Sequence, residues 1–318
     1  MFRKILSIIL GLSILALLYR HVRLGDIHQV FIGADWTFMS FGMVIFVPLI
    51  LLTAWRLVQL VPAEHRIDLG EGSKLILAAS TLNMILPSKM GDLAKAYFLT
   101  DKSNLPISFA FSLVVFERFC DLFAIFFCCT IGLLFYRCNH PFFQILSWLA
   151  ISGLLVTALL ILSKTPTLAL LNFCSMLLPH NLSMKIARLA SSWRELHTYL
   201  WCEPLLVPKI ILVSIGLWGL HLFQIWLFIL ALNASVPFSV SISLTSFSIL
   251  AGLLPLTFAG VGTRDAAILL LFKGFLSPPT AAALGLMCTL RYLLPAVAGI
   301  PFLGRYVVYF GRDKGQLL

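Results

Sequence analysis

The chain has 318 residues, of which 60% are hydrophobic and only 11% are charged, against about 25% charged residues in an ordinary soluble domain. This composition, with a mean hydropathy of +0.99, excludes a single soluble domain and also a disordered chain, which would be polar and charged. It predicts an all-α polytopic membrane protein with one integral membrane domain over residues 1–318. Any function must then be carried by a few polar groups in or beside the bilayer.

Apolar stretches long enough to cross a bilayer recur along the chain. A helix needs about 20 apolar residues to span the hydrocarbon. Six stretches meet or approach that length, at about 5–19, 37–61, 106–136, 142–163, 205–232 and 279–310. The first follows a basic start like a signal peptide, but no small-residue cleavage pattern follows it, so we expect an uncleaved span.

Two further apolar segments, at about 73–99 and 238–276, are interrupted near their middles. The breaks contain Asn83, Pro87, Lys89, Gly91 and Asp92 in the first segment, and Pro255, Gly260, Gly262, Arg264 and Asp265 in the second. Proline cannot donate an amide hydrogen and glycine permits sharp turns, so each segment is predicted to be a re-entrant pair of half-helices. Paired breaks of this kind in inverted halves are typical of a transport site near the midplane.

The predicted inverted repeat has a first half at about 5–163 and a second half at about 205–310. Between them, the more polar stretch at about 165–203 alternates apolar residues such as Leu189 and Trp193 with basic residues such as Arg188 and Arg194. This pattern predicts an amphipathic helix lying on the membrane surface.

The net charge of +10 comes from 23 basic and 13 acidic residues, and the basic residues lie mostly at the ends of apolar stretches. Such placement is typical of topology signals and of contact with anionic headgroups, so no nucleic-acid partner is predicted. With a cytoplasmic N-terminus, most basic residues fall inside, as the positive-inside rule requires. The seven cysteines contain no CxxC pair, and they are interpreted as small apolar side chains.

The stretch after residue 106 carries three charges, Glu117, Arg118 and Asp121. Each charge at mid-helix costs about 2.5–3.5 kcal/mol on insertion scales. Arg118 and Asp121 are three residues apart and can pair, and Glu117 shares a face with Asp121. Arg118 could also meet Asp92 or an anionic headgroup. The group is either a polar path for an anion or proton, or an ion-pair clamp between helices.

Other polar residues have simpler interpretations. Arg56 lies near one end of its span and is expected to extend to the membrane surface. His221 and Gln224 share a helix face and are expected to make packing hydrogen bonds. Asp92 and Asp265 could act only on the helix dipole, and Lys89 could act only as a topology charge. Arg291, in mid-span without an acidic neighbour in sequence, is predicted to be functional. No metal-ligand or nucleotide motif is present.

At these residues the chain resembles the lysylphosphatidylglycerol synthase transmembrane region family, also called flippase-like or UPF0104. The resemblance covers about residues 5–310 and rests on Asn83, Pro87, Lys89, Gly91, Asp92, Glu117, Arg118, Asp121, Pro255, Gly260, Gly262, Arg264, Asp265 and Arg291. Many relatives have Glu where this chain has Asp92 and Asp265, a change that keeps the charge. The resemblance implies a multi-pass protein of the bacterial inner membrane that moves lipids between leaflets. The best-known members add a soluble aminoacyltransferase domain, which this sequence lacks, so lipid synthesis is not expected.

The sequence therefore predicts translocation of an anionic phospholipid or a polyprenyl-linked lipid, without a cofactor or metal. The headgroup would contact Lys89, Arg118, Arg264 and Arg291. Proton or ion coupling, or ion pairing, would fall to Asp92, Glu117, Asp121 and Asp265. The broken-helix backbone at Asn83, Pro87, Gly91, Pro255, Gly260 and Gly262 would offer amide donors to phosphate. The alternatives are a membrane-embedded transferase acting on a lipid-linked donor, and a noncatalytic partner of a lipid-modifying enzyme.

Overall fold

The computed structural model describes residues 23–85, 91–136, 141–177, 180–254, 257 and 260–312, and these ranges contain helices and turns but no strand. The helices are α2 (Leu24–Ile32), α3 (Trp36–Val44), α4 (Phe46–Leu60), α5 (Leu69–Ile85), α6 (Gly91–Ser103), α7 (Ile107–Phe135), α8 (Pro141–Leu162), α9 (Lys164–Leu177), α10 (His180–Cys202), α11 (Leu206–Ala231), α12 (Phe238–Leu253), α13 (Thr263–Leu271) and α14 (Pro278–Arg312), with a short 3-10 turn, η1, at Ala63–His65.

Five helical stretches among the described residues are long and apolar enough to cross a membrane: Trp36–Leu60, Ile107–Phe135, Pro141–Leu162, Leu206–Ala231 and Pro278–Gly304. They confirm five of the six predicted spans and the all-α polytopic class. The first of them combines α3 and α4. The sixth predicted span, at 5–19, lies outside the described residues.

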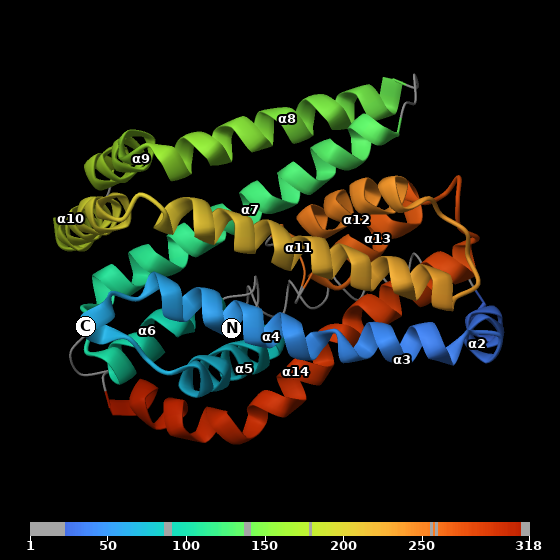
Figure 1. Cartoon of the computed structure of the whole chain (residues 1–318), viewed down its shortest axis with the longest axis horizontal. Helices are drawn as coiled ribbons and strands as arrows, with labels where there is room; N and C mark the ends of the chain where they lie inside the picture. Colours follow the sequence, from blue (N-terminus) through green and yellow to red (C-terminus); the bar gives the residue numbers. More distant parts are fainter. Residues whose placement is uncertain are drawn as a thin grey trace.

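Both interrupted segments form pairs of short helices, α5 with α6 and α12 with α13, as the Pro and Gly residues predict (Figure 1). The two pairs lie toward opposite ends of the long helices in this view. The chain enters α5 and leaves α6 at one end, where His65 Nδ1 lies 2.6 Å from the carbonyl oxygen of Ser103. At the other end, the loop before α12 contacts the α2–α3 turn through Asn233 and Gly33. The α5–α6 pair is therefore a hairpin that enters and returns at the same end.

Glycines allow the close packing at these breaks. A Cβ atom on Gly91 would lie 2.5 Å from the carbonyl oxygen of Ala79, so only glycine lets α6 begin against the backbone of α5. Gly260 and Gly262 have φ angles of 74° and 96°, a region that other residues rarely adopt. Pro87, Lys89 and Pro255 lie outside the described residues.

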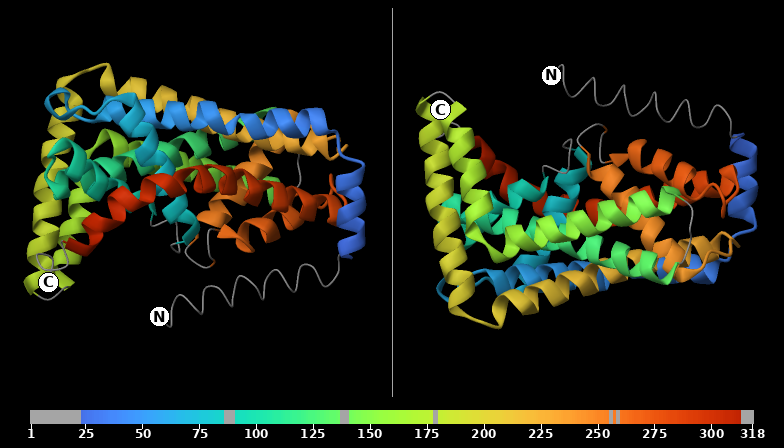
Figure 2. Two further views of the ribbon diagram at one scale, coloured as in Figure 1. Left: turned by 90° about the horizontal axis from the view of Figure 1, so that it is seen from below. Right: turned by 90° about the horizontal axis from the view of Figure 1, so that it is seen from above.

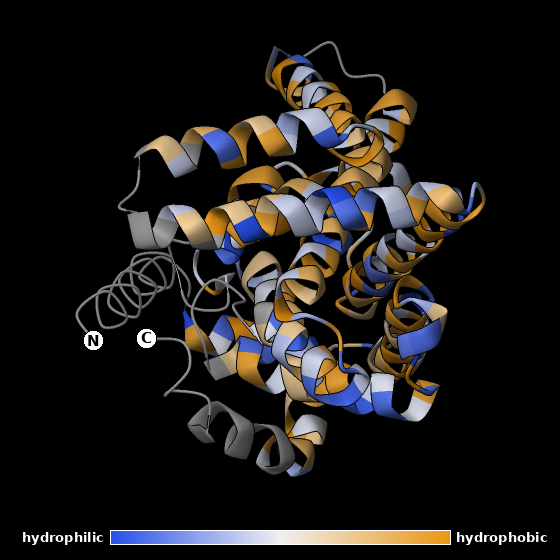
Figure 3. Ribbon diagram, turned by 90° about the vertical axis from the view of Figure 1, so that its left-hand side faces the viewer, coloured by the Kyte–Doolittle hydropathy of each residue, from blue (hydrophilic) through white to orange (hydrophobic). Residues whose placement is uncertain are grey.

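Helices α9 and α10 lie across one end of the long helices, and α2 lies across the other end (Figure 2). Facing the first end, Figure 3 shows hydrophilic and hydrophobic residues mixed along the helices. In α10, Trp193, Leu196 and Leu200 are buried, whereas Arg188 and Arg194 are exposed. The predicted amphipathic character is thus present in α10, and the stretch 165–203 forms two helices rather than one.

Candidate functional site

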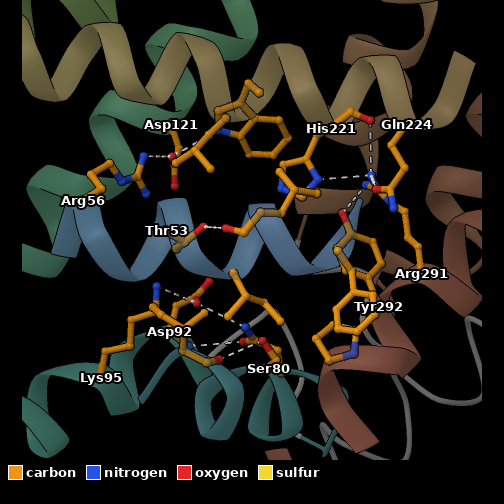
Figure 4. Close-up of a pocket in the computed structure, with 18 of the residues that line it drawn as sticks. Thr53, Arg56, Ser80, Asp92, Lys95, Asp121, His221, Gln224, Arg291 and Tyr292 are labelled. Carbon is orange, nitrogen blue, oxygen red and sulfur yellow. Dashed lines mark hydrogen bonds and ion pairs between the residues drawn. The ribbon is translucent and has the colours of Figure 1, made fainter. Parts of the chain in front are cut away.

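A cavity of about 180 Å³ lies in the middle of the bundle, between α4, α5, α6, α7, α11 and α14 (Figure 4). It is lined by Phe46, Leu49, Ile50, Thr53, Arg56, Ile76, Ser80, Asn83, Met84, Asp92, Lys95, Arg118, Asp121, Leu217, Trp218, His221, Gln224, Arg291, Tyr292 and Pro295. The wall thus combines apolar side chains with charged and polar ones. The predicted site residues Asn83, Asp92, Arg118, Asp121 and Arg291 meet there, although they are far apart in the sequence.

Arg56 is the central cation on one side of the cavity. Its guanidinium lies 2.6 Å from Glu117 Oε1, 2.6 Å from Asp121 Oδ1 and 2.7 Å from Ser214 Oγ. The residue is 1% exposed, so the expectation that Arg56 extends to the membrane surface was wrong. Two carboxylates face only one arginine within α7, and their excess negative charge draws the cation of α4 inward. That excess is the signal in the sequence that could have identified Arg56.

Arg118 and Lys95 complete this group. Arg118 lies 3.2 Å from Asp92 Oδ2 and 3.1 Å from Asp121 Oδ2. Lys95 lies 3.4 Å from both Asp92 Oδ1 and Glu117 Oε1. The predicted pairings of Arg118 with Asp121 and with Asp92 are therefore confirmed. Lys95 is a further site residue that sequence reasoning did not select.

We call Arg56, Lys95, Arg118, Asp92, Glu117 and Asp121 the ion-pair cluster. It contains three cations and three carboxylates, so its formal charge is zero. The side chain of Arg118 is 35% exposed, whereas that of Glu117 is 0% exposed. Arg118 is thus the accessible cation of the cluster. The cluster ties the α5–α6 hairpin to α4 and α7.

Arg291 occupies the opposite side of the cavity in Figure 4. It is 3% exposed. Its guanidinium lies 3.3 Å from His221 Nδ1 and donates to Gln224 Oε1 at 3.2 Å and to the hydroxyl of Tyr292 at 2.7 Å. All three partners are uncharged groups when the histidine is neutral. Arg291 and Arg118 are the predicted headgroup cations that the structure brings to the cavity.

Arg264 does not line this cavity, contrary to the expected polar crevice. It lies 3.0 Å from Asp265 Oδ1, and it also donates to Thr289 Oγ1 at 2.6 Å and to the carbonyl oxygen of Gly285 at 3.2 Å. These partners hold the start of α13 against α14. The position of Arg264 follows from that of Asp265. Asp265 Oδ2 accepts a hydrogen bond from the amide of Gly262 at 2.9 Å and so fixes the first turn of α13.

Backbone amides at the breaks have partners within the protein. Asn83 Oδ1 accepts from the amide of Asp92 at 3.2 Å, and Asn83 Nδ2 donates to Asp92 Oδ1 at the same distance. The amide of Gly262 is held by Asp265. These two amides are therefore occupied rather than offered to a ligand.

The remaining polar residues of the wall join helices. Gln224 Nε2 donates to the carbonyl oxygen of Gly42 at 2.8 Å, which confirms its predicted packing role, and its Oε1 also holds Arg291. Trp218 Nε1 donates to Asp121 Oδ1 at 3.1 Å. Among the described residues, no three His, Cys, Asp or Glu side chains gather as a metal site requires.

Fold and cavity together define a multi-pass α-helical membrane protein with a charged cavity lined by the α5–α6 hairpin and by α4, α7, α11 and α14. Residues 4–299 match the lysylphosphatidylglycerol synthase transmembrane region, and the chain belongs to that family. It is also 28% identical over 317 residues to the UPF0104 membrane protein MJ1595 of Methanocaldococcus jannaschii, an alignment that covers 93% of this chain and 92% of that protein. The resemblance inferred from the motifs is thereby confirmed.

Proposed function

We propose that the protein translocates an anionic lipid across the cytoplasmic membrane, with the headgroup in the cavity and the acyl tails in the surrounding lipid. The observation that carries the proposal is a cavity inside an apolar bundle that presents both Arg118 and Arg291. Intramembrane cations are costly and usually mark a substrate or ion path. A lipid phosphate is the anion that a membrane-embedded arginine can meet there, because arginine binds phosphate through paired hydrogen bonds.

Exposed apolar residues support a passage whose tails stay in lipid. Leu293, Val297 and Ile300 of α14 are 42%, 54% and 56% exposed. They lie on the same helix as Arg291 and Tyr292. One helix thus carries both exposed apolar side chains and polar groups of the cavity wall, as a lipid whose tails stay in the hydrocarbon would require.

The transferase alternative gains no support from the cavity. Its candidate acid or base, Glu117, is 0% exposed and is held by Arg56 and Lys95. A general acid or base needs hydrogen-bond reach to its substrate. Translocation requires no such contact, so it fits this arrangement better.

The test is a lipid-flip measurement in vesicles that contain the purified protein and an anionic lipid labelled on its headgroup. An impermeant reagent quenches label in the outer leaflet, and translocation makes the inner-leaflet label reachable as well. We expect Arg118→Ala to slow this reaction and Lys209→Gln, an exposed charge change on α11, to leave it unchanged. Flip rates equal to those of protein-free vesicles for every anionic lipid tried would contradict the proposal.

A further inference from the structure

Among the described residues, the charges around the cavity do not balance. The ion-pair cluster contributes zero, since Arg56, Lys95 and Arg118 oppose three carboxylates. The pair of Arg264 and Asp265 is also neutral and lies outside the cavity. The remaining charge around the cavity among the described residues is that of Arg291, so the wall has a formal charge of +1.

Arg291 has no carboxylate partner among the described residues. The chain has 13 acidic residues, and Asp313 is the one that lies outside the described ranges. The contacts of Arg291 are with His221, Gln224 and Tyr292, whose ring centroid lies 4.5 Å from the guanidinium carbon. Its Nε atom is buried and has no hydrogen-bond acceptor in the described part of the chain.

A buried cation without a counter-ion is unfavourable, and a bound anion removes that cost. A phosphodiester supplies a single negative charge and two oxygens that match the fork of an arginine. It would therefore neutralise the described part of the wall without leaving an excess of either sign. Gln224 and Tyr292 lie beside the guanidinium, where they can meet hydroxyl groups of a headgroup.

An ammonium group on the headgroup would find no carboxylate without cation partners among the described residues that line the cavity. Asp92, Glu117 and Asp121 each already face two or more cations of the cluster. An added positive charge would have to compete with an arginine or a lysine for one of these carboxylates. The cavity therefore opposes a headgroup amine, although it accepts the phosphate of the same lipid.

We propose that the cavity selects lipids with a monoanionic phosphodiester and an uncharged hydroxyl-bearing headgroup, and that Arg291 holds the phosphate. The inference rests on the proposed function, because it names the cargo of that same cavity. The family name refers to an aminoacylated lipid. By this inference, aminoacylated lipids would bind to the cavity more weakly than phosphatidylglycerol.

The test measures lipid binding and lipid flipping in parallel. The probes are phosphatidylglycerol, phosphatidylethanolamine and an aminoacylated phosphatidylglycerol, presented to the wild type and to three variants: Arg291→Gln, Arg291→Lys and Lys209→Gln. Binding is measured as retention of each lipid by the detergent-purified protein in native mass spectrometry. We expect the wild type and Lys209→Gln to prefer phosphatidylglycerol over both amine lipids by about tenfold, since one lost charge pair is worth about that factor.

Arg291→Gln should bind the three lipids within about twofold of one another, because it removes the unbalanced charge. Arg291→Lys should keep part of the preference, because it keeps the charge but loses the arginine fork. Equal binding by the wild type, tighter binding of an amine lipid, or a preference unchanged in Arg291→Gln would overturn the inference. If Arg291→Gln does not fold, the inference is tested by the lipid preference of the wild type and by its partial loss in Arg291→Lys.

The two readouts separate this inference from the proposed function. Selective binding without flipping supports the role of Arg291 and contradicts translocation. Flipping at equal rates for all three lipids supports translocation and contradicts the selectivity. A purely structural Arg291, which only joins α14 to α11, would change thermal stability in the variants but leave the lipid preference intact, and that result also overturns the inference.

Discussion

The role of each buried cation in this protein depends on whether a carboxylate lies beside it. Arg56, Lys95 and Arg118 are matched one for one by carboxylates, so together they lock helices. Arg291 is buried like Arg56 and Lys95, but it lacks such a match among the described residues. The same residue type thus serves as a clamp in the cluster and as a candidate anion site across the cavity.

Replacing Arg56 should destabilise the protein strongly. Arg56→Met leaves Glu117 and Asp121 without their closest cation, and breaking a buried ion pair costs about 3–5 kcal/mol. The thermal midpoint in detergent should fall well below that of Lys209→Gln, which changes an exposed side chain that contacts Gln59 and the ring of Trp55.

The double variant Arg56→Met with Glu117→Gln should recover part of that loss, because it also removes a stranded carboxylate. If Arg56→Met melts at the temperature of the control, the ion-pair cluster does not stabilise the fold. Equal midpoints for the single and double variants would contradict the coupling of these two residues.

Among the helices, α5 and α14 approach each other most closely at small residues. A Cβ atom on Gly299 would lie 2.1 Å from the carbonyl oxygen of Leu77 and 2.3 Å from Thr81 Oγ1. Thr81 Oγ1 also donates to the carbonyl oxygen of Ala296 at 2.6 Å. This contact fixes the rotation of α14, and therefore the direction in which Arg291 points.

Gly299→Ala should push α14 away from α5 and destabilise the protein by about 1–3 kcal/mol, as overpacking does. Gly219→Ala in α11 is the matched control, because a Cβ atom there meets nothing within 4 Å. That control should be neutral or more stable by up to about 1 kcal/mol, since alanine favours helix over glycine. Equal thermal midpoints for the two variants would contradict close packing at Gly299.

For the complete bundle, charge at the two ends predicts orientation. Among the described residues, Arg66, Lys74, Lys102, Lys164, Arg188, Arg194 and Lys209 lie at or near the end covered by α9 and α10. Arg23 and Lys273 lie toward the other end. By the positive-inside rule, we predict that the end with α9 and α10 faces the cytoplasm.

Cysteine labelling tests this orientation. In a chain with its own cysteines replaced, Lys209→Cys should react with an impermeant maleimide only after the cells are opened, because α11 begins at the basic end. Lys273→Cys should react in intact cells. Both residues are exposed, so both should react after lysis. The opposite pattern of labelling would reverse the orientation of the whole bundle and of the cavity within it.

The sequence by itself determined the membrane class, five of the spans that the structure contains, the two broken segments and the local pairing of Arg118 with Asp121. These features follow from composition and from neighbours three or four residues apart, which any helix brings together. Only the tertiary structure decided that Arg56 joins Glu117, 61 residues away, and Ser214, 158 residues away.

Tertiary structure also separated Arg264 from the cavity and placed Arg291 in it. The physical reason is that helix rotation and close packing, as at Gly299, set the direction of each side chain. Neither is encoded in the local pattern, so the balance of charge around the cavity emerges only when the helices are assembled.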